Sequence, residues 1–198
     1  LRTPLAILRL DLEQDTSEQG KSRMEEVDRM SKLVGDILHL SRIEDRDFPI
    51  SPVVLEPFIQ TILKRVAPLA NAKHITIRQE GPALSVMAHE ELLGHALTNL
   101  IQNAITYNVD GGTITVSTAL QGSQVCIAVT DTGTGIAPHD IVHVFKRFYR
   151  ADKSRTRATG GSGLGLSIVQ SAVERMGGSV HIESEVGVGT TVSILLPR

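Results

Sequence analysis

The sequence has little of three features, and each scarcity excludes a class of protein. A single cysteine, Cys126, excludes an internal disulfide and fits a reducing compartment. The formal net charge of −2 argues against general nucleic-acid binding. No apolar run approaches the about 20 residues that a membrane-spanning helix needs, and no signal peptide is visible. We therefore expect the 198 residues to be soluble and cytoplasmic as given.

The first 46 residues are predicted to form two amphipathic helices joined by the polar turn Asp15–Gly20. Apolar residues recur at alternating intervals of three and four, which is the seam of a coiled coil or a four-helix bundle. The seam positions are Leu1, Leu5, Leu8 and Leu12, then Val27, Met30, Val34 and Ile37. Two such helices cannot bury both flanks of a seam, so the pattern favours a dimeric four-helix bundle. The alternative is a hairpin packed on the rest of the same chain.

A mixed pattern of helices and strands follows this hairpin. The pattern predicts helices over 56–71, 89–107 and 164–176, and strands over 75–79, 113–118, 124–130, 180–183 and 191–196. Elements grouped in this way predict an α+β fold, a two-layer sandwich with one mixed sheet and helices on one face. We divide the chain into a helical hairpin (1–47), a linker (48–52) whose two prolines stop the helix, and a second domain (53–198).

Four short motifs occur in order along the second domain. They are Asn99–Ala104, Asp131–Ile136, Gly161–Leu166 and Gly187–Thr191. Asn99 and Asn103 lie four residues apart, so both side chains lie on one side of their helix. Amide oxygens suit Mg²⁺, a hard cation that prefers oxygen ligands. The alternative is that the two amides cap a neighbouring loop.

The glycine-rich motifs suit a purine nucleotide. Asp131 ends a strand, and its carboxylate can accept a hydrogen bond from the exocyclic amine of adenine, a donor that guanine lacks; the alternative is an aspartate that stabilises its own turn. The glycines 133 and 135 let the backbone approach the base closely. Gly161, Gly163 and Gly165 precede a helix, and a helix N-terminus attracts phosphate.

The segment between the second and third motifs is rich in cations. It spans residues 146–160 and holds Lys146, Arg147, Arg150, Lys153, Arg155 and Arg157. The segment looks like a lid over a triphosphate, and we expect Arg150, and after it Arg155, to contact the γ-phosphate. At least three of the six charges fit equally well as solvated loop residues.

Together the motifs resemble the N, G1, G2 and G3 boxes of sensor histidine kinases and of the wider family that shares their ATP-binding fold. Residues Phe145–Arg150 match the F box, and Leu1–Leu5 match the segment that follows the phosphoacceptor histidine. The resemblance implies ATP and Mg²⁺ as cofactors, Asn103 as the magnesium ligand, and Tyr107 beside the adenine. It places further ATP contacts at Asn99, Ile136, Leu164, Leu166 and Thr190. It also implies a response-regulator receiver domain as partner, a homodimer, and a membrane anchor upstream in the parent protein.

The resemblance also exposes three departures. The acceptor His-Glu pair of the family would fall just before Leu1, so we expect this chain alone not to phosphorylate itself. Thr106 stands where the family usually has Lys or Arg, and His89 stands where it usually has Asp at a helix N-cap. Thr3 lies one helical turn after the acceptor position and, by the resemblance, can orient a water that dephosphorylates the regulator.

Two other functions remain open on these residues. The chain could be an ATP-hydrolysing conformational machine of the gyrase and Hsp90 type, but such enzymes carry a glutamate as general base at the position of Asn99, and an amide is a poor base. It could instead be a nucleotide-binding module without chemistry. Steady release of phosphate would indicate the first, and nucleotide binding without transfer to a histidine would indicate the second.

Overall fold

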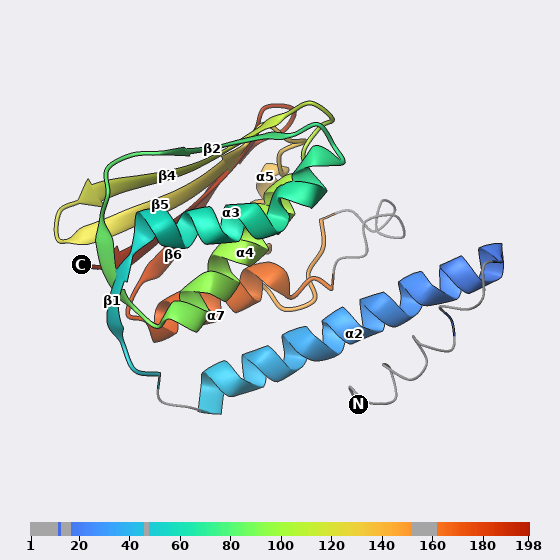
Figure 1. Ribbon diagram of the computed structural model, residues 1–198, viewed down its shortest axis with the longest axis horizontal. Coiled ribbons are helices and arrows are strands. Elements are labelled where there is room, and N and C mark those ends of the chain that lie inside the picture. Colours follow the sequence, from blue (N-terminus) through green and yellow to red (C-terminus); the bar gives the residue numbers. More distant parts are fainter. Residues whose placement is uncertain (1–11, 13–16, 46–47, 152–161) are drawn as a thin grey trace.

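The computed structural model describes residues 12, 17–45, 48–151 and 162–198. A long helix, α2 (Glu18–Asp45), lies alongside a sandwich of helices on a sheet (Figure 1). The helices of the sandwich are α3 (Leu55–Asn71), α4 (Glu90–Thr106), the short α5 (Pro138–Ile141) and α7 (Gly165–Arg175). Its main sheet contains β2 (Thr76–Glu80), β4 (Thr113–Gln121), β5 (Gln124–Asp131), β6 (Ser179–Glu185) and β7 (Gly189–Pro197).

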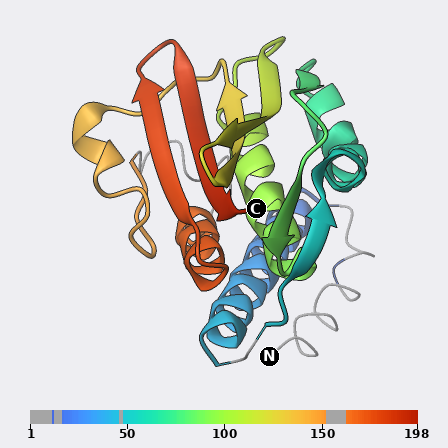
Figure 2. The ribbon, with the colours of Figure 1, turned by 90° about the vertical axis from the view of Figure 1, so that its left-hand side faces the viewer.

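The five strands lie in the order β2-β4-β5-β7-β6. Only β2 and β4 are parallel, and the other neighbours are antiparallel. Helices α3, α4 and α7 lie on one face of this sheet, and α2 runs along the outer side of α7 (Figures 1 and 2). The predicted α+β sandwich, with one mixed sheet covered on one face, is therefore confirmed.

The core lies between the sheet and the three long helices. Strand alternation sends every second side chain inward, so Ile114 and Val116 of β4 and Val125, Ile127 and Val129 of β5 are buried. The opposing helices supply their apolar stripes at helical spacing. In α4, these are Leu93, Ala96, Leu97, Leu100, Ile101 and Ala104. This burial holds α4 and β5 in place, and both carry predicted site residues.

A second, two-stranded sheet was not predicted. Strand β1 (Ser51–Val54) pairs antiparallel with β3 (Ser85–Ala88). Strand β1 takes in Ser51 and Pro52, which sequence patterning assigned to the linker. Proline is compatible with this position because β1 has only one neighbouring strand. The division of the chain into two domains stays a prediction.

The predicted turn at Asp15–Gly20 is partly wrong, because residues 18–20 belong to α2. The hydroxyl of Ser17 accepts a hydrogen bond from the amide of Gly20 at 3.0 Å. A serine that binds the amide three residues ahead is a helix N-cap, and it lets the helix begin within the polar segment. The first predicted helix, apart from Leu12, lies outside the described residues.

Helix α2 buries one part of its apolar surface and exposes another. Leu40 and Ile43 belong to the core of the sandwich. Of the predicted seam residues, Val27 is buried, whereas Met30 and Ile37 are 49% and 45% exposed. The helix therefore packs on α7 and still leaves apolar side chains exposed.

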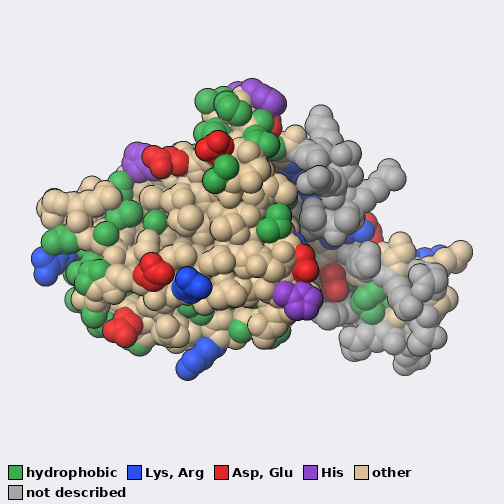
Figure 3. Space-filling model, turned by 90° about the horizontal axis from the view of Figure 1, so that it is seen from above, with side chains coloured by type: hydrophobic (Ala, Val, Ile, Leu, Met, Phe, Trp, Pro, Cys, Tyr) green, Lys and Arg blue, Asp and Glu red, His purple; other side chains and the backbone are tan. Residues whose placement is uncertain are grey.

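The surface carries charges of both signs. On the face shown in Figure 3, acidic and basic side chains are scattered singly and form no broad patch of one sign. No helix in the described ranges is long and apolar enough to cross a membrane.

Gly189 provides a test of the sheet register. Its φ is +146°, and a Cβ there would collide with the carbonyl oxygen of Asp131 on the neighbouring strand. We expect Gly189→Ala to lower the free energy of unfolding by about 2–4 kcal/mol, measured by urea denaturation, because strain and a backbone clash add.

The matched control is Gly187→Ala, where φ is +80° but a Cβ meets nothing within 4 Å. This variant has only the left-handed backbone to accommodate, at a cost of about 1–2 kcal/mol. Equal losses in the two variants would contradict the role given to the close approach of β5 and β7.

Candidate functional site

Three contacts bring the four motifs together at one end of the sandwich, and one of them is between α4 and β5. Helix α4, which carries the first motif, packs against α7, which begins within the third. Strand β5 ends at Asp131, the first residue of the second motif, and pairs there with Thr190 of the fourth motif. The structure therefore assembles in space motifs that lie up to about 90 residues apart in the chain.

The two asparagines of α4 face the start of α7. A Cβ at Gly165 would lie 3.3 Å from Oδ1 of Asn99 and 3.8 Å from Oδ1 of Asn103. The side-chain amide of Asn99 donates to the carbonyl oxygen of His95, one turn back on its own helix, at 3.0 Å. The amide nitrogen of Asn99 thus bonds to its own helix, and the oxygens of both asparagines lie beside the N-terminus of α7. This arrangement suits a cation bound between the protein and a phosphate.

The carboxylate of Asp131 lies at the junction of β5 and β7. Its Oδ1 accepts hydrogen bonds from the amides of Gly133 at 2.8 Å and Thr190 at 3.3 Å. Burial raises the pKa of the Asp131 carboxyl above its ordinary value, and these two hydrogen bonds oppose that rise. Asp131 therefore does stabilise its own turn. Within the described residues both bonds go to Oδ1, which leaves Oδ2 available to a donor on a ligand.

The loop after Asp131 lies against the end of α4. A Cβ at Gly133 would come within 2.5 Å of the carbonyl oxygen of Tyr107, and the amide of Thr134 donates to that oxygen at 3.1 Å. Gly135 has a φ of +67°, and a Cβ there would collide with the backbone of Glu185. The Tyr107 side chain is 48% exposed beside this loop. Tyr107 and Asp131 thus lie on either side of this loop, and their contact with adenine stays a prediction.

Ile136 and Thr190 are joined by a residue that sequence analysis missed. The hydroxyl of Ser184, on β6, accepts from the amide of Ile136 at 2.8 Å and lies 2.8 Å from Oγ1 of Thr190. Ser184 precedes the fourth motif and has no distinguishing neighbour in the sequence. Only the pairing of β6 with β7 brings it beside the second and fourth motifs.

A second missed residue lies at the C-terminal end of α4. The ammonium of Lys73 donates to the carbonyl oxygens of Ile105 at 3.0 Å and Thr106 at 2.6 Å. A cation there complements the negative end of the helix dipole. Lys73 thereby fixes the last turn of α4, next to Tyr107. The side chain of Thr106 donates back to Gln102 of its own helix at 2.7 Å.

His89 serves as the N-cap of α4 despite departing from the family pattern. Its Nδ1 accepts from the amide of Leu92 at 3.4 Å, and its ring lies edge-on against Phe48 with centroids 4.8 Å apart. An imidazole nitrogen can thus take the place of the usual carboxylate as an acceptor.

Arg150 lies at the start of the cationic segment and is half-buried. Its Nε and Nη2 are buried, and neither has a hydrogen-bond partner within the described residues. Just before it, the phenol of Tyr149 donates to Asp140, and this hydrogen bond raises the pKa of Tyr149. A guanidinium with unpaired buried nitrogens is costly unless an anion binds it. Arg155, Gly161 and Thr3 lie outside the described residues.

Gly163, Leu164 and Leu166 complete the predicted set around the start of α7. Gly163 has a φ of +71°, and its carbonyl oxygen accepts from the amide of Phe148 at 2.9 Å. Leu164 is fully buried and precedes the first residue of α7. These contacts attach the F box to the third motif.

A comparison with protein families matches the part of the chain that holds the four motifs. Residues 88–198 match the family described as histidine kinase-, DNA gyrase B-, and HSP90-like ATPase. The full chain is 36% identical to the sensor-like histidine kinase SenX3 of Mycobacterium tuberculosis and 33% identical to the sensor histidine kinase WalK of Bacillus subtilis. It covers 51% of the length of SenX3 and 35% of the length of WalK, so it spans about half or less of these curated relatives.

Solved structures agree with the sequence comparison. Full-length ShkA in complex with AMPPNP superimposes with a TM-score of 0.79 at 29% identity, over 99% of this chain and 43% of ShkA. The histidine kinase AdeS of Acinetobacter baumannii shares the fold, with a TM-score of 0.74 at 21% identity over 99% of this chain and 95% of AdeS.

The raised pKa of Asp131 has opposite consequences for stability and for ligand binding. A carboxyl whose pKa is higher in the folded state gives a stabilising contribution that is present below its ordinary value of 3.8 and lost as the pH rises through the raised value. Between these two values, acidification should therefore stabilise the ligand-free chain relative to Asp131→Asn. Over the same window it should weaken adenine nucleotide binding, because the protonated carboxyl loses its charge. Thermal unfolding measures the stability of both chains, and calorimetric titration measures their nucleotide affinity, at matched pH. If stability and affinity change in the same direction as the pH falls, Asp131 is not the carboxylate that binds adenine.

Proposed function

The chain belongs to the family of histidine kinase-, DNA gyrase B-, and HSP90-like ATPases, and it is similar over its full length to sensor histidine kinases. We therefore propose that it is a kinase core that transfers the γ-phosphoryl group of Mg-ATP to a histidine, from which an aspartate of a response regulator receives it. The observation that carries this proposal is the convergence of Asn99, Asn103 and Gly165 beside the N-terminus of α7, with Asp131 and Thr190 paired at the same end of the sandwich.

Adenine is recognised by Asp131 in this proposal. Oδ2 accepts a hydrogen bond from the exocyclic amine, while Oδ1 is held by the amides of Gly133 and Thr190. Tyr107 lies beside the base. A hydrogen bond to a charged group contributes roughly 1.5–3 kcal/mol, which is enough to select adenine over guanine.

The phosphates extend from the base toward the amides at the start of α7. Asn103, with Asn99 beside it, would hold Mg²⁺, which would neutralise phosphate charge. Within the described ranges, no group of three or more His, Cys, Asp or Glu could hold a metal alone. The amide oxygens of Asn99 and Asn103 alone therefore fit a magnesium ion that would take its remaining ligands from water and phosphate.

Phosphoryl transfer depends mainly on positioning and charge neutralisation. A histidine nitrogen attacks the γ-phosphorus, the bond to the bridging oxygen breaks, and ADP leaves with that oxygen. Arg150 supplies positive charge to the γ-phosphate through its unpaired guanidinium nitrogens. The position at which the hydrolysing relatives would need a glutamate as general base carries Asn99, whose side-chain amide donates to its own helix. This favours transfer over hydrolysis.

We also propose how the whole protein is assembled, where it is located and what its partner is. The exposed Met30 of α2 fits a homodimer through the helical hairpin. We place this region in the cytoplasm of a membrane-anchored sensor whose partner is a receiver domain. Thr3, as a residue that orients water for dephosphorylation, stays a prediction.

Nucleotide selectivity tests the adenine site. The chain should bind ATP and ADP far better than GTP, and ATP binding should require Mg²⁺. Asp131→Asn should weaken ATP binding by about 10- to 100-fold, the loss expected for a charged hydrogen bond. Calorimetric titration measures each affinity.

The matched control is Asp110→Asn, because Asp110 is exposed and pairs with His74 at the surface. It should leave ATP affinity unchanged. Equal affinity for GTP and ATP would exclude the role given to Asp131.

Phosphohistidine formation tests the transfer step. With labelled ATP, the 198-residue chain should not label itself, whereas a chain lengthened at its N-terminus by helical residues that include a His-Glu pair should form acid-labile, base-stable phosphohistidine. In the lengthened chain, Arg150→Ala should lower the labelling rate by about 100- to 1,000-fold, the scale for one lost transition-state donor.

Arg65→Ala is the control, since Arg65 is an exposed cation on α3; its labelling rate should match the parent chain. Labelling of the original 198 residues would show that one of their seven histidines is an acceptor. An unchanged rate in Arg150→Ala would remove Arg150 from the mechanism.

A further inference from the structure

A hydrogen bond joins α2 to the segment just before α7. The hydroxyl of Ser162 donates to Oδ2 of Asp36 at 2.7 Å, across 126 residues of sequence. The same hydroxyl oxygen accepts from the amide of Leu164 at 3.2 Å. The Asp36 carboxylate is therefore two hydrogen bonds from the residue that precedes α7, on the segment that we propose holds the phosphates.

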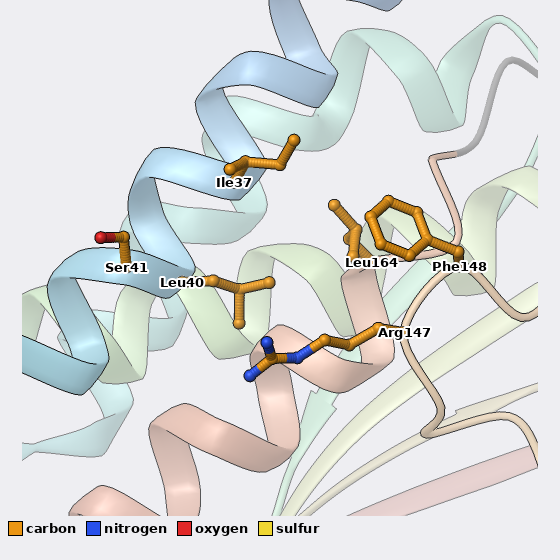
Figure 4. A pocket seen from close by; sticks show the side chains of 6 residues that line it. All are labelled: Ile37, Leu40, Ser41, Arg147, Phe148 and Leu164. Carbon is orange, nitrogen blue, oxygen red and sulfur yellow. The ribbon is translucent and has the colours of Figure 1, made fainter.

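Apolar contacts surround this hydrogen bond. Ile37 and Leu40 point from α2 toward Leu164 and Phe148, and together with Ser41 and Arg147 they line a pocket of about 240 Å³ (Figure 4). Leu40 and Leu164 are both buried. The pocket means that the two surfaces are incompletely packed here. Helix α2 thus docks on the F box and the third motif through buried leucines, beside a pocket and a side-chain hydrogen bond.

We propose that Asp36 and Ser162 form a latch between α2 and the phosphate-binding segment, and that ATP opens it. In the closed latch, the carboxylate of Asp36 lies near the positive N-terminal end of α7. A bound triphosphate brings further negative charge to that end, and like charges at short range repel. The inference rests on the proposed function, because it needs the phosphates at the start of α7.

The coupling acts in both directions. If ATP weakens the contact between α2 and the sandwich, that contact must weaken ATP binding by the same factor. The closed latch is therefore a resting form in which the ATP-binding region is held against α2. ATP releases that region to move relative to the bundle helix.

The expected change in Mg-ATP affinity follows from the typical size of allosteric coupling. Allosteric coupling commonly changes an affinity by about 5- to 150-fold, and we expect the lower end because the hydrogen bond is only partly buried. Removing the carboxylate should therefore tighten Mg-ATP binding by about three- to tenfold. A residue with a purely structural role would loosen binding when it is removed, so the sign of the change separates the two roles.

The affinity experiment uses the full chain and calorimetric titration of Mg-ATP. Asp36→Ala removes both the charge and the acceptor, whereas Asp36→Asn removes the charge and keeps an acceptor for Ser162. Both should bind Mg-ATP more tightly than the parent chain. Adding Ser162→Ala to Asp36→Ala should give no further gain, because the two residues act as one unit. Glu26→Ala is the control, an exposed carboxylate on the same helix that pairs with Arg29.

A distance measurement tests the opening directly. Spin labels on Ser22→Cys of α2 and Gln121→Cys of the β4–β5 hairpin report the docking of α2, since both positions are exposed and the natural Cys126 is buried. Mg-ATP should broaden the distance distribution of the parent chain. Asp36→Ala should show the broad distribution without nucleotide.

The outcomes distinguish the two proposals. If the parent chain binds no Mg-ATP, the proposed function fails and the latch fails with it. If the parent chain binds Mg-ATP but neither Asp36 variant binds it more tightly, or Mg-ATP leaves the distance unchanged, only the latch is overturned.

Discussion

The antiparallel pairing of β5 with β7 is the constraint on which the rest of the site depends. It sets Asp131 opposite Thr190, and the amide of Thr190 donates to the Asp131 carboxylate. The two backbones approach so closely at this point that only glycine fits at position 189. A shift of one residue would turn the side chains of β7 to the other face of the sheet. It would also break the hydrogen bond from the amide of Thr190 to the carboxylate of Asp131.

The packing of α4 on α7 supplies the other half of the site. Burial of apolar side chains along both helices brings Asn99 and Asn103 to the N-terminus of α7, where Gly165 leaves room for them. In the proposed function, the sheet thus positions Asp131, which would select the base, and the helices position the asparagines, which would face metal and phosphate. Lys73 and His89 fix the two ends of α4, so the asparagines are held on a helix that is restrained at both termini.

Helix α2 relates this site to the rest of the protein. It contacts the core through Leu40 and Ile43 and the phosphate-binding segment through Asp36. Met30 on the same helix stays exposed. One helix therefore offers a surface for assembly and a surface that contacts the ATP-binding region, which is the arrangement needed if the state of the nucleotide is to influence the bundle.

The sequence alone determined the order and type of the main helices and strands, because hydrophobic periodicity and glycine positions are local properties. It also identified the four motifs, and the structure brings the described members of all four together. It did not reveal β1 and β3, which are four residues each and lack a clear alternation. Ser17 as a cap, Ser184, Lys73, and the bond between Asp36 and Ser162 were likewise missed. The last three act through partners that lie from 6 to 126 residues away, and such contacts have no local signature. Only the tertiary structure decides them, because they arise when buried apolar surfaces bring distant segments together.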